Sequence, residues 1–303
     1  MKRVFGAAVV ALALVAGGCA GAESATKSGA ATSMDGVRFD PTLNAKLPAA
    51  ARSRGEIRLV TDASYAPMEQ FAADGRTIIG FEPDLASALG SVLGIRITMV
   101  QGDFDSALDD VGKGTYDGVL SSMNDTPERE KKADFLDYFQ AGTSIVVQRG
   151  NPRGVTDLKD LCGQVVATEE GTVQDDLLHR SQHGCDDEKM TIREYKTNAD
   201  ALLQLRTGRA VAVLNDYPPA AYLASDVKTR AYYQLASTVQ YEPGLFGIAV
   251  AKGSSMLRDA LRAALDRIIR SGAYTELLQR WGLTGGGLAA SSINAGSGSS
   301  TGG

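Results

Sequence analysis

The sequence predicts an α/β fold in which short strands alternate with helices and pair mostly in parallel. Two observations lead to this expectation. Apolar runs of strand length alternate along the chain with segments whose apolar residues recur at helical spacing. Polar residues also follow the strands directly, which is where open parallel sheets bind their ligands. Repeated strand–helix units favour parallel pairing, because each helix returns the chain to the side from which the next strand starts.

The first half of the folded body shows this alternation. We expect strands at 57–61, 95–100 and 116–122. A helix is predicted to begin at Asp84 and to end at Gly94, because its apolar residues repeat every three or four positions and glycine commonly follows a helix. A shorter helix is expected within 103–114. Thr126 followed by Pro127 matches a helix N-cap and first helical residue.

The second half repeats the pattern. We expect strands at 162–168 and 209–216. Thr172 with Asp175 three residues later has a capping-box pattern, and Asn198 is expected to cap a helix that ends at Gly208. Residues 254–272 form a strongly amphipathic segment, whose apolar stripe we expect in the core. The stripe consists of Leu257, Ala260, Leu261, Ala264, Leu265, Ile268 and Ile269.

The composition is that of a soluble globular protein. The chain has 303 residues, 44% hydrophobic and 22% charged, so it can bury a sizeable core, and its length suggests about two domains. A net charge of −5 without a Lys/Arg run argues against a nucleic-acid partner. Two histidines and three cysteines offer little material for a zinc site, and neither a metal nor a cofactor is expected.

Residues 1–19 have the pattern of an export signal. Met-Lys-Arg precedes an apolar run that is shorter than the roughly 20 residues of a bilayer span. The run ends in VAGGC, which resembles a bacterial lipobox with Ala16 where leucine is usual. We therefore expect a lipid anchor on Cys19 at the extracytoplasmic face of the cell membrane. The alternative is an ordinary secretory signal with an incidental cysteine.

Two further segments are expected to lie outside the folded body. Residues 20–54 are rich in Ala, Gly, Ser and Thr without a sustained period, which predicts a flexible tether. Residues 285–303 are predicted to be a disordered or loosely packed tail.

Cys162 and Cys185 are expected to form a structural disulfide, because thiols outside the cytoplasm are more often paired than free. The alternative is two free buried cysteines.

Several polar and aromatic residues could form one ligand site. Arg129 offers a planar fork for a carboxylate, although a cation in the first turn of a helix opposes the helix dipole unless an anion lies in front of it. The helix start at Thr172 also suits a carboxylate, while Asp216 with Ser122 suits an ammonium group. Two aromatic residues, Tyr65 and Phe104, lie in corresponding loops and could flank a side chain.

Together these groups describe a site for an α-amino acid, with Arg129 bound to its carboxylate. Each residue alone also has a simpler explanation: a surface salt bridge, a helix cap, or a core aromatic side chain.

Seven segments occur in the order and spacing of a known family: TDASYAPME, GFEPDLASALG, GDFDSAL, KGTYDGVLSSMNDTPERE, DFLDYFQAG, DLKDLCGQVVATEEGT and GRAVAVLND. They resemble the polar-amino-acid-binding proteins of ABC importers, solute-binding protein family 3, which includes the histidine-binding and lysine/arginine/ornithine-binding proteins. The resemblance covers about 55–284. DLCG with a later cysteine is similar to the actinobacterial lipoprotein branch.

The resemblance implies a type II periplasmic-binding-protein fold with two lobes joined by two hinge strands. Lobe 1 is expected at 55–141 and 241–284, and lobe 2 at 142–240. The ligand is expected in the cleft between the lobes, which close over it.

Roles of single residues are implied as well. The resemblance assigns the α-carboxylate to Arg129, Asn124 and the backbone N–H groups of Thr172 and Val173. It assigns the α-ammonium to Asp216 and Ser122, the flanks of the side chain to Tyr65 and Phe104, and its distal end to Asp62. Three residues depart from the family pattern and bear on side-chain specificity: Met68, Asn124 and Val173.

The expected function is therefore the capture of a free amino acid for a membrane permease driven by an ATPase, by a protein that is a monomer by family default and not an enzyme. The expected ligand is basic, then glutamine, then glutamate. A sensor that binds an amino acid is an alternative. A lyase similar to cyclohexadienyl dehydratase is another, with Glu69 and Glu170 as its candidate acid or base.

Overall fold

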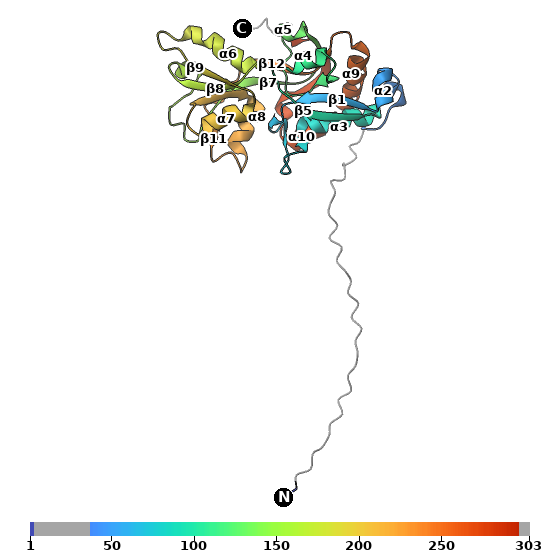
Figure 1. The fold of residues 1–303 in the computed structure, drawn as a ribbon, viewed down its shortest axis with the longest axis horizontal. Coiled ribbons are helices and arrows are strands. Elements are labelled where there is room, and N and C mark those ends of the chain that lie inside the picture. Colours follow the sequence, from blue (N-terminus) through green and yellow to red (C-terminus); the bar gives the residue numbers. More distant parts are fainter. Residues whose placement is uncertain (3–36, 297–303) are drawn as a thin grey trace. The chain divides into compact units, whose positions relative to one another are not determined.

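The computed structural model describes residues 1–2 and 37–296. Residues 3–36 and 297–303 lie outside the described residues. The first of these ranges holds nearly all of the predicted signal segment, including Cys19, and residues 20–36 of the predicted tether. The described body is an α/β fold in which helices flank a mixed ten-stranded sheet (Figure 1). Among the described residues, no helix combines the length and apolar character that a membrane span requires.

The first lobe contains one end of this sheet and a small antiparallel sheet. Its elements are α1 (Pro41–Asn44), α2 (Ala49–Arg54), β1 (Glu56–Thr61), β2 (Ser64–Tyr65), β3 (Glu69–Phe71), β4 (Ile78–Ile79), α3 (Phe81–Leu93), β5 (Arg96–Gln101), α4 (Ala107–Gly112), β6 (Gly118–Val119), α5 (Pro127–Glu130), α9 (Ser255–Arg270) and α10 (Ala273–Trp281). Strand β1 pairs in parallel with β5 and β6, as predicted. The stripe of α9 is buried against α3 and the sheet, and of its residues Ile269 is only partly buried.

The second lobe has its own apolar clusters. Its elements are the 3₁₀ helices η1 (Leu158–Leu161) and η2 (Gln182–Gly184), β8 (Val165–Glu169), α6 (Val173–Ser181), β9 (Thr191–Tyr195), α7 (Asn198–Arg206), β10 (Ala212–Asp216), α8 (Tyr217–Ser225) and β11 (Tyr233–Leu235). Strand β8 pairs in parallel with β9 and β10, which confirms the predicted arrangement here too. Two clusters of buried side chains form its core.

Two long strands connect the lobes. β7 (Ala133–Gln148) and β12 (Tyr241–Ala251) are antiparallel to each other along most of their length. β12 also pairs with β6 of the first lobe, and β7 pairs with β10 of the second. One continuous sheet therefore runs through both lobes, and its parallel parts are separated by antiparallel strands.

The tether predicted for residues 20–54 is wrong for 37–54, which pack on the first lobe. Leu47 is fully buried, and Asp40 caps α1 while its carboxylate forms an ion pair with Arg267 of α9. These short helices bury few side chains, so an Ala-rich sequence gives little periodic signal for them.

The tail predicted for residues 285–303 is also wrong in part. After η3 (Thr284–Gly286), β13 (Gly287–Ile293) pairs with β7. Ser292 donates a 2.6 Å hydrogen bond to Asp137, and the Gly296 N–H donates one of 2.9 Å to Asp125. Strand pairing uses backbone groups that every residue carries, so small polar residues can form a strand where composition alone predicts disorder.

Two predicted helix starts need correction, whereas two are confirmed. Helix α3 begins at Phe81, before Asp84, and α7 is capped by Thr197, whose hydroxyl accepts from the N–H of Asp200. The Asn198 side chain instead donates to the Ser64 carbonyl at 3.1 Å, a contact that local sequence cannot reveal. The N-caps at Thr126 and Thr172 are present as predicted. Of the capping box predicted at Thr172, the structure has the bond from the Asp175 N–H to the Thr172 hydroxyl, which is one of its two bonds.

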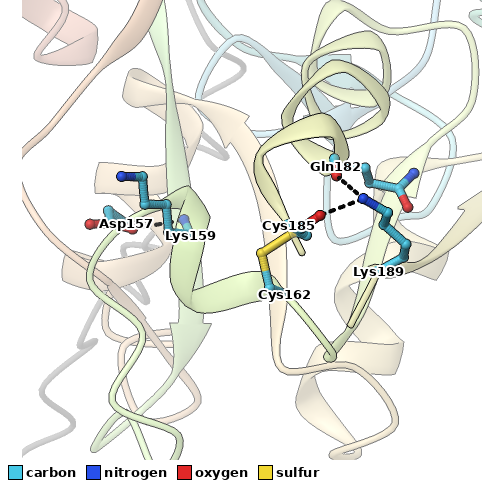
Figure 2. The surroundings of a disulfide bond; sticks show 6 residues. All are labelled: Asp157, Lys159, Cys162, Gln182, Cys185 and Lys189. Atoms are coloured by element: carbon cyan, nitrogen blue, oxygen red, sulfur yellow. Dashed lines mark hydrogen bonds between the residues drawn. A yellow bond between two sulfur atoms is a disulfide. The ribbon is translucent and has the colours of Figure 1, made fainter. Parts of the chain in front are cut away.

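The predicted disulfide between Cys162 and Cys185 is present (Figure 2). It joins the end of η1 to the end of η2, and Lys189 donates to the carbonyls of Gln182 and Cys185 beside it. Cys185 is buried in one of the second-lobe clusters, so the bond is part of the core of that lobe.

Replacing Cys162 and Cys185 together by serine is expected to lower the free energy of unfolding by about 3 kcal/mol, because the unfolded chain regains the freedom of the closed loop. Urea unfolding measures this change. Wild-type protein in a thiol reductant should unfold at the same urea concentration as the double variant. A double variant with the midpoint of the oxidised wild type would contradict the prediction.

The carboxyl groups beside β13 should make stability depend on pH. Burial is the main cause that raises the pKa of Asp125 to about 8, and the charges of Asp137 and Glu130 act in the same direction. The hydrogen bond from the Gly296 N–H acts to lower this pKa. An acid with a raised pKa binds more protons when folded, so its stabilising contribution is present below pH 3.8 and is lost as the pH rises through about 8. The free energy of unfolding is therefore expected to fall over this window.

Asp125→Asn mimics the protonated carboxyl group, so its unfolding free energy should fall less steeply with pH than that of the wild type. Urea unfolding at several pH values measures both slopes. Asp74→Asn is the control, because hydrogen bonds from Thr77 lower the pKa of this exposed carboxyl to about 2, outside the window. Equal slopes for Asp125→Asn and wild type would refute the assignment.

Candidate functional site

A cleft between the two lobes is lined by residues from both. Seven of the nine ligand-binding residues predicted from the sequence line this cleft: Asp62, Tyr65, Phe104, Ser122, Asn124, Thr172 and Asp216. The lining is completed by Glu69, Ser121, Glu169, Gln174, Asn198, Leu214 and Asn215. Many of these residues lie at or just after the ends of β1, β6, β8 and β10, where an α/β fold is expected to bind ligands.

Two of the predicted residues do not line this cleft. Val173 is the first residue of α6, directly after Thr172. Arg129 donates to the carbonyl oxygens of Asn124 and Gly171, both at 2.9 Å, and its guanidinium lies 5.4 Å from the centre of the Phe104 ring. Burial lowers the pKa of Arg129 to about 10, so the side chain is still charged at neutral pH.

Asp216 and Tyr65 connect the lobes across the cleft. The Tyr65 hydroxyl donates to the Asp216 carboxylate at 2.8 Å and accepts from the Asp216 N–H at 2.7 Å. Burial raises the pKa of Asp216 to about 7, although Tyr65, Arg129 and Gln174 act to lower it. The carboxylate is costly to keep charged in this closed cleft without a cationic partner.

Ser122 is held in an unusual conformation at the edge of the cleft. Its φ of 47° lies in the left-handed region, which is uncommon for a residue with a side chain. Both its N–H and its hydroxyl donate to Glu82 at 2.8 Å. Because the hydroxyl proton is used by Glu82, the lone pairs of the Ser122 oxygen can accept a hydrogen bond from a ligand.

Besides Asp216, three carboxyl groups line the cleft: Asp62 and Glu69 from the first lobe and Glu169 from the second. Burial raises the pKa of Glu169 well above its usual range, and the charge and hydrogen bond of Asp62 raise it further. Burial likewise raises the pKa of Glu69, with the Glu82 and Asp62 charges adding to the effect. Burial therefore disfavours the charged forms of these carboxyl groups, and the lining residues of the cleft include no lysine or arginine to offset such charge.

The lobes are closed on one another in this structure. Besides the Tyr65–Asp216 pair, Asn198 of the second lobe donates to the Ser64 carbonyl, and Arg129 of the first donates to the Gly171 carbonyl. A Cβ atom on Gly171 would lie 2.4 Å from a carboxylate oxygen of Asp105, and the Gly171 φ of +71° also favours glycine. The two lobes thus meet closely at the mouth of the cleft.

Several lining residues escaped the sequence reasoning as ligand contacts. Three of them are direct sequence neighbours of residues that were considered: Glu169, Gln174 and Asn215. Their position at a strand end or helix start could have identified them as ligand contacts. Asn198 could not be found this way, because it reaches the cleft from α7, whose start is 134 residues from its partner Ser64. Of the two candidate catalytic acids, Glu69 lines the cleft, whereas Glu170 forms an ion pair with Lys196.

Comparison with known proteins agrees with this architecture. Residues 57–284 match the family described as bacterial extracellular solute-binding proteins, family 3. The chain is 31% identical over 259 residues to the arginine-binding protein ArgT of Corynebacterium glutamicum, an alignment that covers 84% of this chain and 83% of that protein.

Two solved structures have the same two-lobed fold. An ancestral arginine-binding protein bound to arginine aligns with a TM-score of 0.69 and 29% identity over 75% of this chain and 98% of its own. The ancestral amino acid-binding protein AncCDT-1, a precursor of cyclohexadienyl dehydratase, aligns with a TM-score of 0.68 and 31% identity over 79% of this chain and 99% of its own. Because the family match spans most of its two-lobed body, the chain belongs to family 3 of the bacterial extracellular solute-binding proteins.

Proposed function

We propose that the protein captures an α-amino acid with a cationic side chain, of the arginine type, and delivers it to the permease and ATPase subunits of an ABC importer. The charges in and beside the cleft carry this proposal. The Arg129 guanidinium, next to the lining residues Phe104 and Asn124, and the Asp216 carboxylate suit the two ends of the zwitterion, and further carboxyl groups suit a cationic side chain. The arginine-binding names of the Corynebacterium relative and of the ancestral structure support the same ligand class.

The α-carboxylate is assigned to Arg129. A guanidinium has five N–H donors, and among the described residues two of them bond to the carbonyls of Asn124 and Gly171. The remaining donors can bind a carboxylate, with Asn124 and the start of α6 at Thr172 and Val173 as further donors. The α-ammonium is assigned to Asp216 and the Ser122 oxygen, and it relieves the charge that burial opposes on Asp216.

The side chain is assigned to the space near Asp62 and Glu169. These carboxyl groups come from opposite lobes and interact in the closed structure, so closure without a cation forces two like charges together or requires a proton. A guanidinium or ammonium group can hydrogen-bond to both. Tyr65 and Phe104 supply aromatic surface for the aliphatic part of the ligand.

Closure then follows from the division of the contacts between the lobes. In this proposal residues 55–141 with 241–284 move as one lobe, together with residues 37–54 and 285–296 that pack on it, and residues 142–240 move as the other. The ligand binds first to Arg129 and its neighbours, and closure adds Asp216 and Glu169. Moving an equilibrium from 1:99 to 99:1 takes about 5.5 kcal/mol, which a few charge-assisted hydrogen bonds can supply.

The proposed location is the outer face of the cell membrane, with the protein exported by residues 1–19 and anchored as a monomer through a lipid on Cys19. The sequence pattern around Cys19 supports this proposal. An amino-acid sensor has the same cleft, and amino-acid uptake by cells that lack the protein distinguishes the two roles.

A lyase is the less favoured function. Lyase chemistry requires an acid or base aimed at the substrate. Ser121 donates to Glu69 at 3.3 Å, and the carboxyl group of Glu69 lies beside Glu82 in a buried pair. Glu170 is held by Lys196. The AncCDT-1 structure is itself described as an amino acid-binding protein.

Arg129→Ala and Asp216→Ala are each expected to weaken arginine binding by at least about 100-fold, because each leaves one charged end of the ligand buried without its partner. Isothermal titration calorimetry with arginine measures the affinity, and urea unfolding checks that both variants still unfold cooperatively. Arg180→Ala is the control, since Arg180 pairs with the exposed Glu242. Near wild-type affinity in both site variants would reject the proposed site.

Glu169→Gln is expected to separate charge recognition from amino-acid recognition. Arginine should bind about 10-fold or more weakly, because a charge-assisted hydrogen bond is lost, while the affinity for glutamine should stay the same or increase. The neighbouring Glu170→Gln, which removes only the Lys196 ion pair, should leave both affinities unchanged. Parallel titrations with the two amino acids test this, and an equal loss for both ligands would show that Glu169 does not select the cation.

A further inference from the structure

We propose that Asp175, His179 and Glu194 form a binding site for a divalent transition-metal ion, with Zn²⁺ as the expected ion. Asp175 and His179 lie four residues apart on α6, and Glu194 lies on β9 of the same lobe. One ligand atom from each of the three residues lies within 4.8 Å of the other two. The site is separate from the amino-acid cleft, whose lining includes none of these residues.

The distances suit a shared metal ion. His179 Nε2 lies 3.1 Å from Glu194 Oε1 and 3.5 Å from Asp175 Oδ1. Nitrogen and oxygen ligands bound about 2.0–2.2 Å from a tetrahedral Zn²⁺ are separated by roughly 3.3–3.5 Å. Small side-chain rotations therefore suffice to place all three atoms around one ion, with a water molecule as the fourth ligand.

The chemistry of the three side chains also suits a bound cation. Asp175 Oδ1 is buried and has no hydrogen-bond partner among the residues that the structure describes. A neutral imidazole with two carboxylates is a ligand set that zinc accepts, whereas Ca²⁺ and Mg²⁺ prefer oxygen ligands alone.

A protonated His179 that bridges the two carboxylates is the competing explanation. A single Nε2–H points its proton at one acceptor, and Glu194 at 3.1 Å is the nearer one. Asp175 Oδ1, at 3.5 Å, is then left without a good hydrogen bond. A metal ion has no such limit, because it binds to all three ligand atoms at once.

Metal binding at this place should stabilise the start of α6. The N–H of Asp175 donates to the Thr172 hydroxyl at 3.1 Å, and Thr172 and Gln174 line the amino-acid cleft. An ion bound by α6 and β9 therefore holds the cleft-forming end of this helix against the sheet without occupying the cleft.

Isothermal titration of the purified protein with ZnCl₂, in a buffer that does not chelate zinc, tests the proposal. One Zn²⁺ per chain should bind, and His179→Ala and Glu194→Gln should each weaken this binding by at least about 10-fold. The matched control is His183→Ala, which removes the other histidine of the chain and should bind zinc as the wild type does. Zn²⁺ should also raise the melting temperature of the wild type and of His183→Ala, but not that of His179→Ala.

Three results would overturn the proposal. They are a wild type without saturable 1:1 zinc binding, a His179→Ala variant with wild-type zinc affinity, and a wild type that binds CaCl₂ as tightly as ZnCl₂. Melting in EDTA checks the fold of each variant. If His179→Ala fails to fold, Glu194→Gln, which keeps the size of its side chain, decides the outcome by the same criteria.

Discussion

In the cleft the two lobes contact one another mainly through polar groups, and the proposed opening and closing of the protein depends on this. The apolar cores are separate clusters, two in each lobe. The cleft is crossed instead by hydrogen bonds such as those between Tyr65 and Asp216 and between Asn198 and Ser64. Each such bond contributes only about 1 kcal/mol, because water satisfies the same groups when the lobes are apart. In the proposed mechanism, closure is therefore balanced closely enough for a small ligand to decide it.

The carboxyl groups in the cleft determine whether closure is favourable with a given ligand in this proposal. Exclusion of water raises the pKa values of Asp216, Glu69 and Glu169, which means that the closed form disfavours their charged state. A cationic ligand replaces the lost solvation, whereas a neutral side chain leaves the carboxyl groups to be neutralised by protons. In this proposal selectivity comes from charge compensation as well as from shape, because a cationic side chain offsets the repulsion between Asp62 and Glu169 without the binding of a proton.

The first lobe is held beside the cleft partly by a segment whose structure is hard to predict from its sequence. Strand β13 pairs with β7, one of the two strands that connect the lobes, and Gly296 and Ser292 hold the buried carboxyl groups of Asp125 and Asp137. Asp125 directly follows the cleft residue Asn124. The C-terminal strand therefore braces the first lobe immediately beside the proposed site, although its composition suggests a loose tail.

The sequence by itself determined the α/β alternation, the helix caps at Thr126 and Thr172, the α9 stripe and the residues at strand ends that line the cleft. These features depend on neighbouring residues, so their periodicity and capping chemistry can be read locally. The tertiary structure decided which groups face one another: Glu82 with Ser122, Tyr65 with Asp216, and His179 with Glu194. Tyr65 and Asp216 are 151 residues apart, and no local pattern encodes such a meeting. Their contact arises because the packing of two lobes around shared strands fixes the positions of residues that are distant in the chain.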